Sequence, residues 1–174
     1  MIAIRQEKYT GVKTCTPGER IRAPRARILR HLGEAESDLL LKILSEPLQY
    51  VDNSLFHSRR AAREMEAGFD TPEDEFRFAQ ARLLPLDMLD GPDRLVRRFK
   101  PLSMDQETQL FLKFNFARYC ICRLLKKYQD HEIGLAQAKS LLRWKHRELQ
   151  IRSILTQANI PLVLAMAKRM KPND

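Results

Sequence analysis

The residues whose chemistry could support catalysis or metal binding are few and widely spaced in this 174-residue chain. The four histidines lack the spacing of a zinc site: His31, His57, His131 and His146. The acidic run of Glu73, Asp74 and Glu75 is more often the solvated first turn of a helix than a cation site. The sequence has no Gly-rich phosphate loop and no G-x-S-x-G turn. These patterns predict a protein that is not an enzyme and that uses no metal or cofactor.

The three cysteines predict a chain kept in a reducing compartment. Cys120 and Cys122 lie too close along a helix to pair with each other, and they lack the C-x-x-C spacing of a redox motif. Cys15 is far away in the sequence, so no disulfide framework is indicated. No apolar stretch approaches the length of a membrane span, and residues 1–13 lack the apolar centre of a signal peptide. We therefore expect a cytoplasmic protein with no membrane partner.

Charge and composition favour a helical protein with an anionic partner. Hydrophobic residues make up 44% of the chain, which is enough for a core, while 30% charge and six glycines fit a helical protein. The net charge of +9 favours nucleic acid or an acidic protein surface as a partner.

The N-terminal part of the chain divides into two expected regions. Residues 1–33 contain eight Lys and Arg residues and two acidic ones, a composition that predicts a flexible, disordered basic arm. This arm could contact DNA or RNA, or it could be a solvated leader. Residues 34–100 are interrupted by prolines and glycines, which predicts a helical leader of short, broken helices.

Residues 101–174 carry the strongest signals for helices. Ser103 and Gln106 have the spacing of a capping box, in which each residue's side chain bonds to the other's backbone. Apolar residues then recur with helical period as far as Tyr128, and a second stripe begins at Leu135. We expect the two longest helices within residues 103–129 and 134–159. The fold class is all-α: an irregular helical bundle with a flexible basic N-terminal arm.

Two segments of this region resemble the sigma-70 family of bacterial RNA polymerase sigma factors. The stretch LSMDQETQLF, at residues 102–111, is similar to the family pattern L-[ST]-x-[ED]-[EQ]-E-x-x-L-F. The stretch ANIPLVLAMAKR, at residues 158–169, is similar to A-N-L-R-L-V-x-x-[IM]-A-[KR]-[KR]. The resemblance covers residues 102–128 and 149–170, and it implies that residues 101–174 form a pre-core helix followed by the first core helix.

The resemblance also implies which residues bind each partner. In the family, the first motif contacts promoter DNA downstream of the minus-ten element, which suggests five DNA-binding residues: Ser103, Gln106, Lys113, Arg118 and Arg123. The second motif forms a helix of the domain that docks on polymerase, which suggests a second set: Asn159, Leu162, Val163, Met166, Lys168 and Arg169. Asn159 is expected inside the bundle, where it would need a hydrogen-bond partner.

The function implied is transcription initiation, with RNA polymerase core and promoter DNA as partners. The chain ends at Asp174, before the family's minus-ten-binding segment and helix-turn-helix, so it is expected to be a truncated sigma factor that binds promoter DNA only weakly alone. The alternative is a regulatory interaction protein that binds polymerase, a sigma partner or an anti-sigma protein without touching DNA. A generic RNA-binding module is disfavoured, because the sequence lacks an aromatic stacking platform.

The second motif departs from the family at one position. Pro161 stands where the family has arginine, and proline removes a backbone donor and crowds the preceding turn. We therefore predict a break or kink between Gln157 and Leu162. We also expect the two apolar faces to pack together, with Leu110, Phe114 and Ile121 lying near Leu155, Leu162 or Met166.

Overall fold

The computed structural model describes residues 9–17, 24–67, 69 and 102–170, and helices make up 75% of these residues. The elements follow one another as β1 (Tyr9–Cys15), α1 (Ala26–His31), α2 (Glu34–Ser45), β2 (Leu48–Asn53), α3 (Ser54–His57), α4 (Arg59–Ala67), α7 (Met104–Lys127) and α8 (Leu135–Met170). The prediction of a mostly helical fold is confirmed, and β1 and β2 add a small two-stranded sheet that was not expected. Expectations for residues 70–101, including the acidic run at 73–75, lie outside the described residues.

The capping box at the start of α7 is confirmed in full. The Ser103 hydroxyl oxygen accepts a hydrogen bond from the Gln106 backbone N–H at 3.2 Å. The Gln106 Oε1 atom accepts one from the Ser103 backbone N–H at 3.1 Å. These two bonds satisfy donors that a helix start leaves unpaired, and Asp105 and Glu107 add negative charge at the positive end of the helix dipole. The local sequence therefore fixes where α7 begins.

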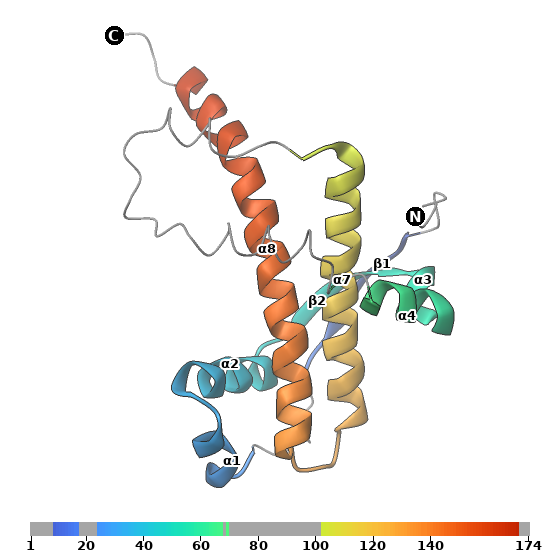
Figure 1. Ribbon diagram of the computed structural model, residues 1–174, viewed down its shortest axis with the longest axis vertical. Helices are drawn as coiled ribbons and strands as arrows, with labels where there is room; N and C mark the ends of the chain where they lie inside the picture. The colour runs from blue at the N-terminus through green and yellow to red at the C-terminus, as the bar shows by residue number, and fades with distance from the viewer. Residues whose placement is uncertain (1–8, 18–23, 68, 70–101, 171–174) are drawn as a thin grey trace.

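Helices α7 and α8 form an antiparallel pair that supplies most of the core. They pack along their length and are joined by the short connection at residues 128–134 (Figure 1). On α7, the predicted face is buried at Leu110, Ala117 and Ile121, and Leu155 of α8 is also buried. Phe114 is only partly buried. The two apolar stripes therefore belong to one core, while the individual residue pairs expected from sequence stay a prediction.

An aromatic cluster fills the space between this pair and α3 and α4. Phe116 of α7 lies at its centre, with its ring centroid 5.5 Å from that of Phe56 and 5.6 Å from that of Trp144. Phe69 and Tyr119 complete the cluster, at 6.4 Å and 6.2 Å from Phe116. Aromatic pairs at these separations stabilise a core beyond the area they bury. The cluster holds α3 and α4 against α7.

Strands β1 and β2 pair in an antiparallel sheet that the sequence patterns did not predict. Val12 pairs with Val51 and Cys15 with Leu48, and the register shifts between Tyr9 and Val12. Gly11 lies in this irregular stretch with φ of 103°, a conformation that glycine adopts without a steric penalty. The Val51 N–H donates to Asn115 Oδ1 of α7 at 2.8 Å, which attaches the sheet to the helical pair.

Parts of the N-terminal segment that was expected to be a disordered arm have regular secondary structure. Tyr9–Cys15 form a strand and Ala26–His31 form helix α1, so these parts of the predicted disordered arm are ordered. The predicted arm was wrong here because strand pairing joins residues far apart in the sequence, and a local composition carries no sign of it. Residues 1–8 and 18–23 lie outside the described residues.

Helix α8 runs without a break from Leu135 to Met170, with Pro161 inside it. The predicted break is therefore wrong, and α8 extends well past the expected end at residue 159, while the alternative of a kink stays a prediction. Position 161 has no N–H to donate to the carbonyl four residues earlier, but it is only half-buried, so water can reach the backbone there. The Asn159 side chain also braces the preceding turn, because its Nδ2 donates to the Leu155 carbonyl at 2.8 Å. The helix consequently tolerates the proline.

Candidate functional site

Ser103 and Gln106, the first two predicted DNA-binding residues, use their side chains in the capping box of α7. Both residues lie near the surface, but their polar side-chain atoms already bond to backbone groups. Their spacing is thus explained by the helix start alone. Lys113, the third predicted residue, lies on the next part of α7 with its Nζ 5.8 Å from the centroid of the Phe69 ring.

Arg118, the fourth predicted DNA-binding residue, is a link between three elements. Its Nε and Nη2 donate to Oε1 of Glu148 on α8 at 3.1 Å and 3.0 Å. Its Nη1 donates to the Gln49 carbonyl of β2 at 2.7 Å. The guanidinium also lies over the Phe114 ring, with Cζ 4.2 Å from the centroid. With its side chain 23% exposed, Arg118 contributes to the fold through these contacts.

Glu148 is the centre of a buried ionic cluster that the sequence reading missed. It is fully buried, and its Oε2 accepts from Lys145 Nζ at 2.6 Å while its Oε1 accepts from Arg118. Buried carboxylates are rare unless cations and hydrogen bonds compensate for lost solvation. The i,i+3 spacing of Lys145 and Glu148 was visible in the sequence. The partner on α7 was not, because it lies 30 residues away.

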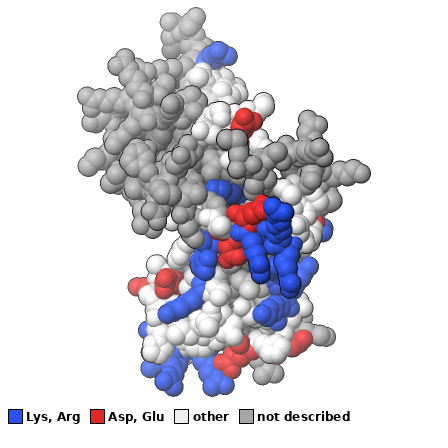
Figure 2. Space-filling model, turned by 45° about the vertical axis from the view of Figure 1, so that its right-hand side comes forward, with Lys and Arg blue, Asp and Glu red and all other residues white. Residues whose placement is uncertain are grey.

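Arg123, the fifth predicted DNA-binding residue, lines a hollow between α7 and the helices α3 and α4. We call this hollow the arginine pocket, and it is defined by Phe56, His57, Ser58, Arg59, Ala62, Arg63, Glu66, Phe116, Tyr119, Cys120 and Arg123. Its volume is about 330 Å³. Arg59, Arg63 and Arg123 are all exposed, so their guanidinium groups are available to a ligand. Figure 2 shows Lys and Arg gathered over this part of the surface, with acidic residues among them.

A buried aspartate fixes His57 at the edge of the arginine pocket. His57 Nε2 lies 3.0 Å and 3.1 Å from the two carboxylate oxygens of Asp52, and Lys13 of β1 forms an ion pair with the same carboxylate. The His57 ring also meets the Tyr119 ring edge-on at 5.3 Å. Nearby, burial and the Asp52 charge raise the pKa of Tyr50 to about 12, so this phenol stays neutral at physiological pH.

The arginine pocket has the chemistry of a phosphate-binding surface. Guanidinium groups donate two parallel hydrogen bonds to phosphate oxygens and remain charged at any physiological pH. Among the residues of the pocket, only Arg123 was predicted from sequence. Arg59 and Arg63 were missed because they belong to the leader, where the family resemblance carries no motif. The RRAAR run at residues 59–63 was the available signal.

The residues predicted to dock on polymerase lie on the last turns of α8. Leu162, Val163 and Met166 are 59%, 62% and 56% exposed, so the expectation that Leu162 and Met166 pack in the bundle is wrong. The physical reason is length: α8 has 36 residues and α7 has 24, so about three turns of α8 extend beyond α7 (Figure 1). We call Leu162, Val163 and Met166 the α8 apolar face.

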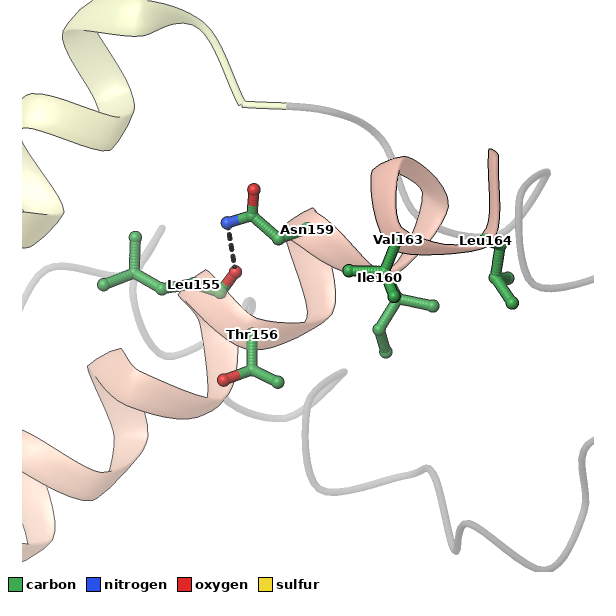
Figure 3. A pocket seen from close by; sticks show the side chains of 6 residues that line it. All are labelled: Leu155, Thr156, Asn159, Ile160, Val163 and Leu164. Carbon is green, nitrogen blue, oxygen red and sulfur yellow. Dashed lines mark hydrogen bonds between the residues drawn. The ribbon is translucent and has the colours of Figure 1, made fainter. Parts of the chain in front are cut away.

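The other predicted docking residues belong to the same part of α8. Asn159 is partly buried rather than held inside a bundle, and its partner is the Leu155 carbonyl of its own helix. An open hollow of about 530 Å³ is lined in the described structure by Leu155, Thr156, Asn159, Ile160, Val163 and Leu164. Figure 3 shows these side chains and the hydrogen bond from Asn159 to the Leu155 carbonyl. Arg169 is exposed, and Lys168 occupies the preceding helical position. The predicted residues thus share one helix end.

Comparisons with known proteins identify no relative: no protein family matches the chain, and no curated protein or solved structure is significantly similar to it. Within the part of the chain that the structure describes, no group of three His, Cys, Asp or Glu side chains could hold a metal ion. No helix there is both long and apolar enough to cross a membrane.

Proposed function

We propose that this protein is a sigma-70-like transcription-initiation protein that associates with RNA polymerase core and contacts promoter DNA, without being sufficient alone for promoter recognition. The proposal rests on the two sequence motifs and on one structural observation. That observation is the α8 apolar face, which displays Leu162, Val163 and Met166 on a helix end with no neighbouring helix beside it in the described structure.

The α8 apolar face has the character of a protein-binding surface. Met166 lies four residues after Leu162 and three after Val163, so the three side chains share an arc of about 100° on the helix surface. Single exposed apolar residues are common, but a contiguous apolar stripe on a projecting helix is typical of an interaction site. A helix of this kind binds by placing its apolar side in a groove of the partner. In the proposed function, that partner is polymerase or the remaining helices of a sigma core.

The arginine pocket supplies the proposed contact with DNA. Arg59, Arg63 and Arg123 can bind phosphates, and phosphate contacts position a protein on DNA without reading its sequence. Ser103, Gln106 and Arg118 have side chains engaged within the fold, which leaves few candidates for base contacts on α7. Weak binding without promoter selectivity is therefore expected. The alternative is a regulatory protein that binds polymerase, and it predicts no DNA binding at all.

Binding to polymerase core should require the α8 apolar face. In the Leu162→Glu/Val163→Glu variant, two charges would have to be buried in the interface, and we expect affinity for purified bacterial RNA polymerase core to fall by roughly 10-fold or more. Both side chains are already exposed, so the variant should fold normally by circular dichroism. The measurement is biolayer interferometry with immobilised core enzyme.

The matched control for this experiment is Leu41→Glu. Leu41 is an exposed leucine on α2, away from the predicted docking residues. It should leave polymerase binding unchanged. Equal affinity for all three proteins would show that the α8 apolar face is not the docking surface, and the absence of any binding to polymerase would remove the proposed function.

DNA binding should depend steeply on salt and should involve the arginine pocket. If about five phosphates are neutralised, the logarithm of affinity should fall with the logarithm of salt concentration at a slope of about −4.5. In the Arg63→Ala/Arg123→Ala variant, two of these contacts are lost, so the slope should become shallower by about 1.8. Fluorescence anisotropy with promoter and scrambled duplexes at several salt concentrations measures both values.

The control for the DNA experiment is Lys139→Ala/Arg152→Ala, which removes the same charge from exposed positions on α8. Its slope should stay close to that of the unmodified protein. If the two double variants behave alike, the arginine pocket has no special role. If the protein does not bind DNA at low salt but does bind polymerase, the regulatory alternative is correct.

A further inference from the structure

Two cysteines that are far apart in the sequence meet inside the fold. Cys15 ends β1 and Cys122 lies in the middle of α7, and both are buried, with exposed fractions of 5% and 2%. The Cys15 Sγ lies 4.0 Å from the Cys122 carbonyl oxygen, to which it donates. Each thiol also lies close enough to the other to shift its pKa. We call Cys15 and Cys122 the thiol pair.

The third cysteine is a natural reference for the thiol pair. Cys120 is on the same helix and is equally buried, at 1% exposed. Two positions along a helix correspond to a rotation of about 200°, so Cys120 and Cys122 point to opposite sides of α7. Cys122 faces β1, whereas Cys120 lines the arginine pocket. Any chemistry that depends on this geometry must therefore distinguish the two.

The three thiols have different pKa values, so they differ in how readily each forms a nucleophilic thiolate. The hydrogen bond from Cys122 lowers the pKa of Cys15 to about 7 despite burial, and the positive charge of Lys126 also lowers it. The hydrogen bond to Cys15 and burial raise the pKa of Cys122, and burial raises the pKa of Cys120 to about 12. Near neutral pH, Cys15 is therefore partly ionised, and its thiolate form, which no longer donates to the Cys122 carbonyl, is the nucleophile, while Cys122 stays a thiol.

We propose that Cys15 and Cys122 form a reversible disulfide when the protein meets a peroxide, and that this bond fastens strand β1 to helix α7. The Cys15 sulfur attacks one oxygen of hydrogen peroxide, the O–O bond breaks, and Cys15 becomes a sulfenic acid with release of water. Cys122 then attacks the Cys15 sulfur, the S–O bond breaks, and a second water leaves with the thiol proton. Two thiols are oxidised by two electrons while the peroxide is reduced to two waters.

The bond would act on the most weakly anchored part of the sheet. β1 pairs with β2 alone in the described structure, so the second side of β1 is an open edge. A disulfide between residues 15 and 122 would close a long loop of the unfolded chain, which raises the stability of the folded state. The inference uses only the thiol pair and stands whether or not the proposed function is correct.

The test is treatment of the purified, fully reduced protein with hydrogen peroxide at pH 7, followed by non-reducing peptide mapping. The expected product is a Cys15–Cys122 cross-linked peptide that has lost the mass of two hydrogen atoms, with Cys120 still a free thiol. A thermal melt should show the oxidised protein unfolding roughly 5 to 10 °C higher than the reduced one, and dithiothreitol should reverse the shift. Alkylation of Cys15 by iodoacetamide should rise with pH through a midpoint near pH 7, well below that of Cys120.

Matched variants separate the two steps. Cys120→Ser should still form the cross-linked peptide, whereas Cys122→Ser should stop at a Cys15 sulfenic acid that dimedone traps. The peptide map of the unmodified protein shows whether the Cys15–Cys122 disulfide forms, even if a variant fails to fold. A map in which all three thiols stay reduced under peroxide, or in which Cys120 reacts as fast as Cys15, would overturn the proposal.

Discussion

Replacement of Glu148 by alanine is expected to lower the free energy of unfolding by about 3 to 5 kcal/mol. Glu148 is fully buried, and its carboxylate is the shared partner of Arg118 and Lys145, whose side chains are only 23% and 16% exposed. Without the carboxylate, two positive charges would remain close together in a poorly solvated region. Urea unfolding followed by circular dichroism measures the change as a shift of the midpoint at constant slope.

Two further variants serve as controls for Glu148→Ala. Glu64→Ala removes an exposed ion pair with Arg60 on α4, and such a pair contributes about 1 kcal/mol or less. Glu148→Gln keeps the volume and one acceptor oxygen but loses the charge, so its stability should fall between Glu148→Ala and the unmodified protein. A loss for Glu148→Ala no larger than that for Glu64→Ala would mean that the buried cluster does not stabilise the fold.

Replacement of Phe116 by alanine should cost a comparable amount, about 3 to 5 kcal/mol, because it removes a large buried side chain and leaves a cavity. Phe116 is 2% exposed and contacts the rings of Phe56, Phe69, Tyr119 and Trp144. The loss should also free α3 and α4 from α7, since these rings connect them. Denaturant unfolding gives the energy, and Trp144 fluorescence should shift toward that of a solvated indole.

Phe111 provides the matched control for Phe116. It is a phenylalanine on the same helix, but it is 46% exposed. Phe111→Ala should change the free energy of unfolding by only about 0.5 kcal/mol, because it removes little buried surface. If the two variants were equally stable, the aromatic cluster would not be part of the stabilising core.

Helix α7 could be predicted from the sequence because its determinants are local. The capping box, the acidic first turn and the basic last turn all lie within the helix or next to it, and each was visible in the residue order. The periodic apolar residues likewise specified which face is buried. Predictions of this kind succeed when the interactions that decide the structure are a few residues apart.

The sheet and the arginine pocket could not be predicted in the same way. The pairing of β1 with β2 joins residues 33 to 44 positions apart, and the bond from Val51 to Asn115 spans 64 positions. The arginine pocket combines Arg59 and Arg63 of α4 with Arg123 of α7. Nothing in the local sequence of either segment indicates the other, so only the folded chain brings these residues together.

The end of α8 shows how a correct local observation can support a wrong conclusion. The apolar residues Leu162, Val163 and Met166 have helical spacing, and the helix exists, but their spacing does not say whether anything covers them. Pro161 was expected to interrupt the helix because it removes one backbone donor. One missing bond at a half-exposed position is a small cost compared with the many bonds on either side.

Pro161 also determines how α8 responds to a sideways force. A regular α-helix resists bending because successive turns are joined by parallel hydrogen bonds, and at Pro161 one of these bonds is absent. The helix therefore has its most compliant point between the part packed on α7 and the three exposed turns that carry Leu162, Val163 and Met166. If a partner binds those turns, we expect the helix to flex at Pro161 and the α7–α8 pair to keep its packing.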